Sequence, residues 1–174
     1  QRINAAVATD VCLPIWTTTP WTLPANQAVA LHPDLDYVQV SVKENTTQLI
    51  VAEELLSTTL ARYDLTLNKV VARFKGGLLE FLQLQHPFLD KKVPIVLGEH
   101  VTTEVGTGAV HTAPAHGEDD YQVALKYNLP VDSILDSRSC FLETVPNVAG
   151  MHVFKANQPI VELLTEKGVL LSGA

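Results

Sequence analysis

The amino-acid sequence predicts an α+β fold in which short strands form a closed or nearly closed β-barrel, flanked by a few helices. Two observations support this class. Short runs of β-branched and aliphatic residues recur along the chain and are separated by Pro, Gly, Asn and Asp. The helix-like segments are few and do not alternate regularly with these runs, which argues against a parallel βαβ sheet.

The expected strands are segments whose length and composition suit a pleated, half-buried surface. Each is bounded by residues that favour turns. They are Val11–Thr18, Tyr37–Val42, Gln48–Ala52, Val70–Phe74, Val93–Leu97 and Gly108–Thr112.

The expected helices lie between and after these strands. Residues 52–63 carry leucines at helical spacing. Residues 117–128 open with three acidic side chains, which suit the positive end of a helix dipole. Residues 156–168 offer Asn157 as an N-cap, Pro159 in the first turn and a glycine as the stop.

Composition narrows the class of protein. The 174 residues suit one domain with a sizeable core, and 47% hydrophobic against 18% charged residues indicate a globular chain. A net charge of −7 argues against a broad nucleic-acid surface, but not against one nucleic-acid end entering a pocket. Cys12 and Cys140 form no paired motif, so we expect a reducing, cytoplasmic setting. No apolar run predicts a membrane span, and the missing initiator Met suggests an excised domain.

The first unusual stretch is WTTTPWTLPAN, residues 16–26. Three β-branched hydroxyl residues favour extended backbone, in which Thr17 and Thr19 share one face and Thr18 takes the other. Pro20 then ends the strand by removing a backbone donor. The segment is therefore either a well-satisfied turn or a row of hydroxyl groups that can bind a polar ligand.

The second unusual stretch is GTGAVHTAPAHGEDDY, residues 106–121. A short strand is expected to deliver His111 at its end, and acidic residues open the helix that follows. A histidine and a carboxylate on either side of one strand–loop–helix connection could hold a substrate amine and position water. The alternatives are a core histidine, acids that only complement the helix dipole, and a zinc site built from His111, His116 and Asp119 or Asp120.

The two stretches together resemble the editing domain of isoleucyl-tRNA synthetases, a large insertion in the class I catalytic fold. The similarity covers residues 11–170, including HPFLDKKVPIVLGEHV and FKANQPIVELL. The valine and leucine relatives carry an Arg in the threonine block and lack the His–Thr–Ala–Pro run. Thr19, Trp21 and His111 therefore favour the isoleucine branch.

The resemblance implies a role for each motif residue. Thr17, Thr18 and Thr19 would hold the terminal adenosine and the aminoacyl ester of a tRNA, and would thereby act in catalysis with Asp120. Asp120 would also bind the substrate α-ammonium group. The remaining residues would bind the substrate or lie beside it. Trp21 would line the side-chain pocket, and His111 would exclude isoleucine from it. Thr22 would extend the threonine wall, Asn26 would close the loop, and Asp119 and His116 would lie nearby.

The implied reaction is hydrolysis of valine esterified to the isoleucine tRNA, by a positioned water that the neighbouring ribose hydroxyl orients. We expect no cofactor and no metal, since ATP would serve only a synthetic domain whose nucleotide-binding signatures this chain lacks. The expected partners are the tRNA 3′ CCA end and the rest of the synthetase chain, with a single 174-residue editing domain acting as a monomer away from membranes. Two alternatives are a module that only binds a CCA end and a metal-dependent hydrolase.

Overall fold

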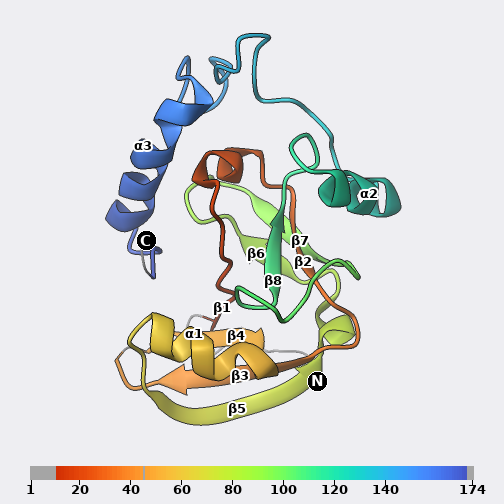
Figure 1. Cartoon of the computed structure of the whole chain (residues 1–174), viewed down its shortest axis with the longest axis vertical. Helices are drawn as coiled ribbons and strands as arrows, with labels where there is room; N and C mark the ends of the chain where they lie inside the picture. Colours follow the sequence, from red (N-terminus) through yellow and green to blue (C-terminus); the bar gives the residue numbers. More distant parts are fainter. Residues whose placement is uncertain (1–10, 45, 172–174) are drawn as a thin grey trace. The chain divides into compact units, whose positions relative to one another are not determined.

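The computed structural model describes residues 11–44 and 46–171. The described chain forms two compact units. The first unit holds the described residues up to Trp16 together with Ala30–Glu80 and Leu97–Val110. The second unit holds Thr17–Val29, Phe81–Val96 and the described residues from His111 onwards. Figure 1 labels the strands and α-helices of both units.

The first unit is built on a four-stranded sheet of order β1-β4-β3-β5. Its core forms because β3 alternates, so that Val38, Val40 and Val42 share one face. Leu60 from the helix α1 packs with these valines. The elements of this unit are β1 (Val11–Cys12), β3 (Asp36–Val42), β4 (Gln48–Ala52), η2 (Glu53–Leu55), α1 (Leu56–Arg62), β5 (Leu67–Lys75) and η3 (Gly76–Leu79).

The second sheet has the order β6-β7-β2-β8. β6 (Gln83–Gln85) and β7 (Lys92–Leu97) pair in an antiparallel hairpin, in which Leu84 lies opposite Val93. β2 (Ala28–Leu31) is buried at every position, and β8 (Ala109–Thr112) ends one residue after His111. The second unit contains the 3-10 helix η1 (Pro20–Ala25) and the α-helices α2 (Glu118–Tyr127) and α3 (Val153–Glu166).

The expected β-barrel is wrong. Among the described residues each sheet has two edges, formed by β1 and β5 in one sheet and by β6 and β8 in the other, so neither sheet closes. A barrel needs a continuous ring of hydrogen-bonded neighbours with a fixed stagger. The chain instead divides its short strands between two open mixed sheets with a few helices, which is an α+β arrangement without closure.

Most expected strands are present, with shifted ends. Gln48–Ala52 has the expected bounds, whereas Val11–Thr18 is paired only at Val11–Cys12. Pro14 follows this pair and offers no N–H to a neighbouring strand, which limits the ladder to its first residues. β2 and β6 were not predicted, because four and three residues are too few to show a period.

The C-terminal helix begins earlier than expected. Its N-cap is His152, whose Nδ1 accepts the backbone N–H of Phe154, and not Asn157. The buried side chains Val153, Ala156, Ile160 and Leu164 continue the apolar face upstream, and this packing outweighs the hydrogen bond that Pro159 removes inside the helix. No helix of the described residues is long and apolar enough to cross a membrane.

Candidate functional site

The threonine run is not a strand but the approach to the 3-10 helix η1. Thr19 is the N-cap residue of η1, and Pro20 occupies the first helical position, where a missing N–H costs nothing. The Oγ1 atoms of Thr17 and Thr19 lie 3.4 Å apart, so these two hydroxyls share one side as expected. The side chains of Thr18 and Thr19 are exposed and Thr17 is half-buried. Hydroxyl groups are therefore presented to solvent directly before η1.

His111 is held by two side chains of the first motif. Its Nε2 lies 2.8 Å from Oγ1 of Thr22, and its Nδ1 lies 3.2 Å from Nδ2 of Asn26. Thr22 and Asn26 are 7% and 4% exposed and His111 is partly buried, so most of this network is shielded from water. The structure thus brings together Thr22, Asn26 and His111, which lie 85 and 89 residues apart in the sequence.

The hydrogen-bond network fixes the tautomer of His111. Nδ2 of Asn26 also lies 2.8 Å from the carbonyl oxygen of Ala28, which identifies this atom as the amide nitrogen and a donor. Nδ1 of His111 must therefore accept, and the ring proton sits on Nε2 and is donated to Thr22. The Thr22 hydroxyl in turn donates to the carbonyl of Thr19 at 2.9 Å. His111 has no ring nitrogen left to accept a proton from water.

Burial keeps this ring neutral. Desolvation lowers the pKa of His111 below its usual value, and the nearby negative charge of Asp120 offsets this only in part. A second proton on Nδ1 would also face the Asn26 amide donor. The ring is therefore a rigid, uncharged body, which suits a group that limits space and not one that transfers protons.

Asp120 is folded back over the start of its own helix. Its Oδ2 accepts the backbone N–H of Ala113 at 2.9 Å, which ties the first turn of α2 to the residue after β8. Gly117 permits this position, because a Cβ there would lie only 3.1 Å from the same oxygen. The charge of Asp120 raises the pKa values of His111 and His116, although burial dominates and both remain lowered.

His116 connects Asp120 to the pocket tryptophan predicted from the sequence. The rings of His116 and Trp21 meet edge to face, with centroids 5.0 Å apart. Nε2 of His116 is buried without a hydrogen-bond partner among the described residues. Asp119, in contrast, is exposed in the first turn of α2. His116 thus belongs with Trp21 and Asp120, as the sequence resemblance expects, whereas nothing ties Asp119 to this group.

Two residues that sequence reasoning missed hold the end of η1. His86 is 2% exposed and lies with Nε2 3.0 Å from the carbonyl of Leu23, while its Nδ1 accepts the backbone N–H of Leu89 at 3.0 Å. The Lys91 ammonium donates to the carbonyl of Asn26. Burial lowers the pKa of His86 to about 4 and also lowers that of Lys91. The only signal for either residue was the HPFLDKK run, which has no periodicity to interpret.

The described residues do not form a metal centre. Among the described residues, no three His, Cys, Asp or Glu side chains are placed to hold one ion. His111 in particular uses both ring nitrogens within the protein, so it offers no lone pair to zinc. Metal-independence remains a prediction for the reaction itself.

Comparison with known proteins identifies the family. The family model described as "Leucyl-tRNA synthetase, editing domain" matches residues 2–153. The chain belongs to this family of synthetase editing domains. It is 56% identical over 168 residues to an isoleucine–tRNA ligase of Alkalilimnicola ehrlichii, covering 97% of this chain and 18% of the relative. It is 54% identical over 174 residues to the isoleucine–tRNA ligase of Coxiella burnetii, covering 98% and 19%.

Solved structures agree on the fold of this editing domain. The P. knowlesi cytosolic leucyl-tRNA synthetase editing domain matches with a TM-score of 0.71 at 12% identity, over 91% of this chain and 82% of that one. The P. falciparum counterpart matches with a TM-score of 0.69 at 13% identity, over 91% and 78%. The editing domain described here spans about a fifth of the length of the isoleucine ligases that it matches, 18% and 19% for the two relatives above.

Proposed function

We propose that this chain is the editing part of an isoleucine–tRNA ligase and hydrolyses valine from the misacylated isoleucine tRNA. The observation that carries the proposal is the arrangement in the second unit. His111 is held there between Thr22 and Asn26, the Thr22 hydroxyl donates to the carbonyl of Thr19 in the exposed threonine run, and Asp120 interacts with His111 through its charge. The similarity to isoleucine–tRNA ligases over nearly the whole chain supports the choice of amino acid.

Each group has a part in the proposed reaction. Water adds to the ester carbonyl, the bond from carbon to the ribose oxygen breaks, and that oxygen takes up the proton. Thr17, Thr18 and Thr19 bind the adenosine end and the ester through their hydroxyls, and Asp120 binds the α-ammonium group. His111 uses both ring nitrogens within the protein, so the neighbouring ribose hydroxyl, and not this imidazole, orients the water.

The two buried motif residues act through the protein and not on the substrate. The amide hydrogens of Asn26 are both used, on Ala28 and His111, and the Thr22 hydroxyl is used on Thr19. We therefore replace the expected substrate contacts of Asn26 and Thr22 by a positioning role. They hold the imidazole of His111 where it excludes the longer side chain of isoleucine, while Trp21 forms another part of the side-chain pocket.

The test is deacylation of valyl-tRNA by a complete isoleucine–tRNA ligase carrying this domain. Asp120→Asn keeps an oxygen for the Ala113 N–H but removes the charge, so it should lose on the order of tenfold to a hundredfold in rate without unfolding. Isoleucylation by the same enzyme is the matched control and should not change. A wild-type enzyme that binds the tRNA end without releasing valine would favour the binding-module alternative.

Cofactor and partner proposals follow from the same mechanism. Hydrolysis should need no cofactor and no metal, and the partners should be the CCA end of a mischarged tRNA and the remainder of the synthetase chain, acting as a cytoplasmic monomer. Exhaustive chelation should leave the deacylation rate unchanged. Loss of the rate with restoration by zinc would instead establish a metal-dependent hydrolase.

A further inference from the structure

The start of η1 has an N–H group that the helix itself cannot satisfy. Pro20 has no N–H, and the N–H of Thr22 bonds to the carbonyl of Thr19 at 3.0 Å. The N–H of Trp21, the second helical residue, remains. At such a position the side chain of the N-cap residue normally accepts the bond, and threonine is well suited to this role. Thr19 is the N-cap residue here, yet its side chain makes no capping bond.

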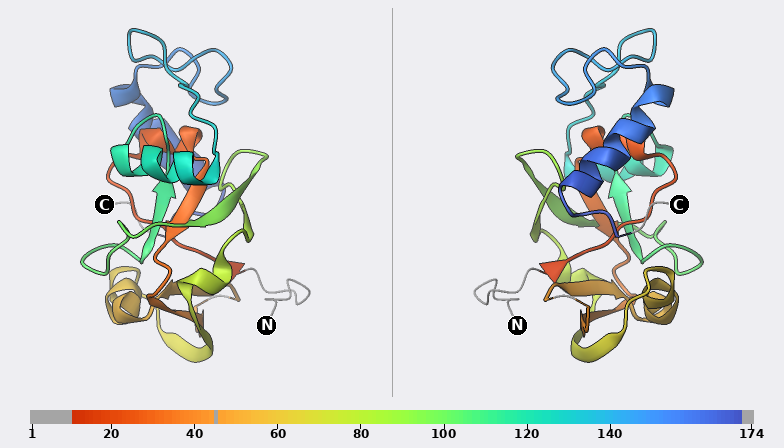
Figure 2. Two further views of the ribbon diagram at one scale, coloured as in Figure 1. Left: turned by 90° about the vertical axis from the view of Figure 1, so that its right-hand side faces the viewer. Right: turned by 90° about the vertical axis from the view of Figure 1, so that its left-hand side faces the viewer.

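The missing cap is supplied by a residue far away in the sequence. Oδ1 of Asn157, in α3, accepts the N–H of Trp21 at 3.0 Å across 136 positions. Figure 1 and both views of Figure 2 place α3 beside η1, and the two elements pack together within the second unit. Asn157 is free for this contact because His152 caps α3 one turn earlier.

Because Asn157 supplies the cap, the Thr19 hydroxyl is available to a ligand. Its side chain is exposed, and among the described residues its Oγ1 has only the 3.4 Å contact to Thr17 and no bond to the backbone of η1. If Thr19 capped its own helix, the hydroxyl oxygen would be turned toward the N–H of Trp21 and would use a lone pair there. The same bond also fixes the backbone of Trp21, whose ring contacts His116.

We propose that Asn157 is a positioning residue of the editing site, which caps η1 from α3 and thereby keeps the Thr19 hydroxyl available to the aminoacyl ester. This inference rests on the proposed function, because it assigns Thr19 to the ester. Neither motif contains Asn157, and α3 presents it only through tertiary packing.

The experiment is a double-mutant cycle in the complete ligase. Asn157→Ala should lower kcat/KM for deacylation of valyl-tRNA by about tenfold, because Thr19 then turns to cap Trp21. Asn157→Asp keeps the oxygen acceptor and should restore the rate. Gln158→Ala, which removes a surface contact of the neighbouring residue with Glu162, is the matched control and should match wild type. In a Thr19→Ala background, Asn157→Ala should cost little more.

A second readout does not depend on activity. Amide exchange at Trp21 should stay slow in Asn157→Ala, where Thr19 replaces the cap, and become fast only in the double variant. Equal rate losses from Asn157→Ala in both backgrounds, or fast exchange in the single variant, would overturn the proposal. If the alanine variant does not fold, Asn157→Gln displaces the same acceptor by one methylene and takes its place. A wild-type enzyme that released no valine would contradict the proposed editing function. Amide exchange at Trp21 would still show whether Asn157 caps η1.

Discussion

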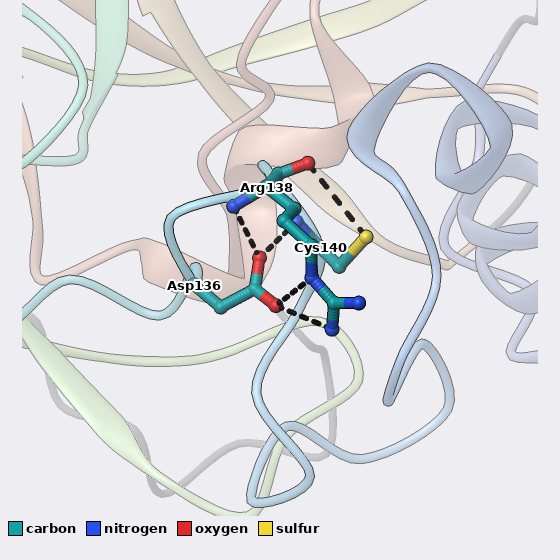
Figure 3. A network of polar contacts seen from close by, with 3 residues as sticks. All are labelled: Asp136, Arg138 and Cys140. Atoms are coloured by element: carbon teal, nitrogen blue, oxygen red, sulfur yellow. Dashed lines mark hydrogen bonds and ion pairs between the residues drawn. The ribbon is translucent and has the colours of Figure 1, made fainter.

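Two polar networks in the second unit use the same hydrogen-bonding groups in opposite settings. The first joins Thr22, Asn26 and His111, which are far apart in sequence, and its threonine and asparagine are buried. The second lies within five residues of a loop, where Asp136 accepts the backbone N–H groups of Arg138 and Cys140 and pairs with the exposed Arg138 guanidinium (Figure 3). The polar groups of both networks have hydrogen-bond partners. Only the first network joins the two sequence motifs, so only it can fix the position of one motif relative to the other.

The difference teaches where polar contacts carry function in this fold. A buried group without its partner costs its full desolvation penalty, so a closed network permits one arrangement of its members. In an exposed ion pair, water can replace either partner at little cost in free energy. Three predictions test this comparison and a fourth tests the buried His86 at the end of η1, beginning with the largest expected effect.

Asn26→Leu should be the most damaging change. It leaves Nδ1 of His111 and the carbonyl of Ala28 without donors, at a cost of about 3 kcal/mol in unfolding free energy for two orphaned buried groups. Urea unfolding of the domain measures this loss. A variant as stable as wild type would show that water enters the network, and the comparison would then fail.

His86 should make the domain lose stability in acid. Its pKa is about 4 in the folded protein against 6.5 for an unperturbed side chain, so below pH 6.5 the unfolded chain binds a proton that the folded chain refuses. Stability should fall as the pH drops from 6.5 towards 4, by about 3 kcal/mol in total from this residue. His111 shifts in the same direction and adds to the fall.

The measurement is the unfolding free energy between pH 7.5 and pH 4.5. His86→Gln should lower stability at the higher pH, because the contacts to Leu23 and Leu89 are disturbed, and should flatten the acid slope. An unchanged slope in this variant would assign the acid sensitivity to other groups.

His111→Ala should change selectivity more than it changes catalysis. Without the ring, the larger ester fits, so deacylation of isoleucyl-tRNA should rise by about tenfold or more relative to valyl-tRNA, the range that one methylene is worth in such a pocket. His111→Phe keeps a ring without nitrogens and should still spare isoleucine. Parallel loss of both deacylation activities in the alanine variant would make His111 structural or catalytic.

Asp136→Ala should have the smallest effect. The side-chain contacts drawn in Figure 3 join residues of one loop, and the Arg138 side chain is 82% exposed. We expect unfolding and deacylation close to wild type, with faster amide exchange confined to Arg138 and Cys140. A clear fall in the deacylation rate would mean that this loop reaches the substrate. Both networks would then contribute to function, and the comparison would fail.

Sequence alone determined the elements with strong local signals. The aliphatic strands such as Gln48–Ala52 and the acidic start of α2 follow from local preferences, whereas the threonine run, expected as a strand, leads into the unpredicted helix η1. The two motifs also carried the family resemblance, which the comparisons confirm. His111, Trp21 and Asp120 could be named as one group from that resemblance. In the structure Asp120 interacts with His111 and His116 through its charge and His116 contacts Trp21, while the roles of these residues in the reaction stay predictions.

Only the tertiary structure decided whether the sheets close, which tautomer His111 adopts and which residues cap the helices. Whether short strands close into a barrel depends on which edges pair, and no residue in a strand encodes that by itself. The Asn26 side chain acts within the protein because its amide group donates to the carbonyl of Ala28 and to the ring of His111. Asn157 looked like the cap of its own helix and instead caps η1. These outcomes depend on partners distant in sequence, since a hydrogen-bonding side chain has many possible partners and burial selects among them.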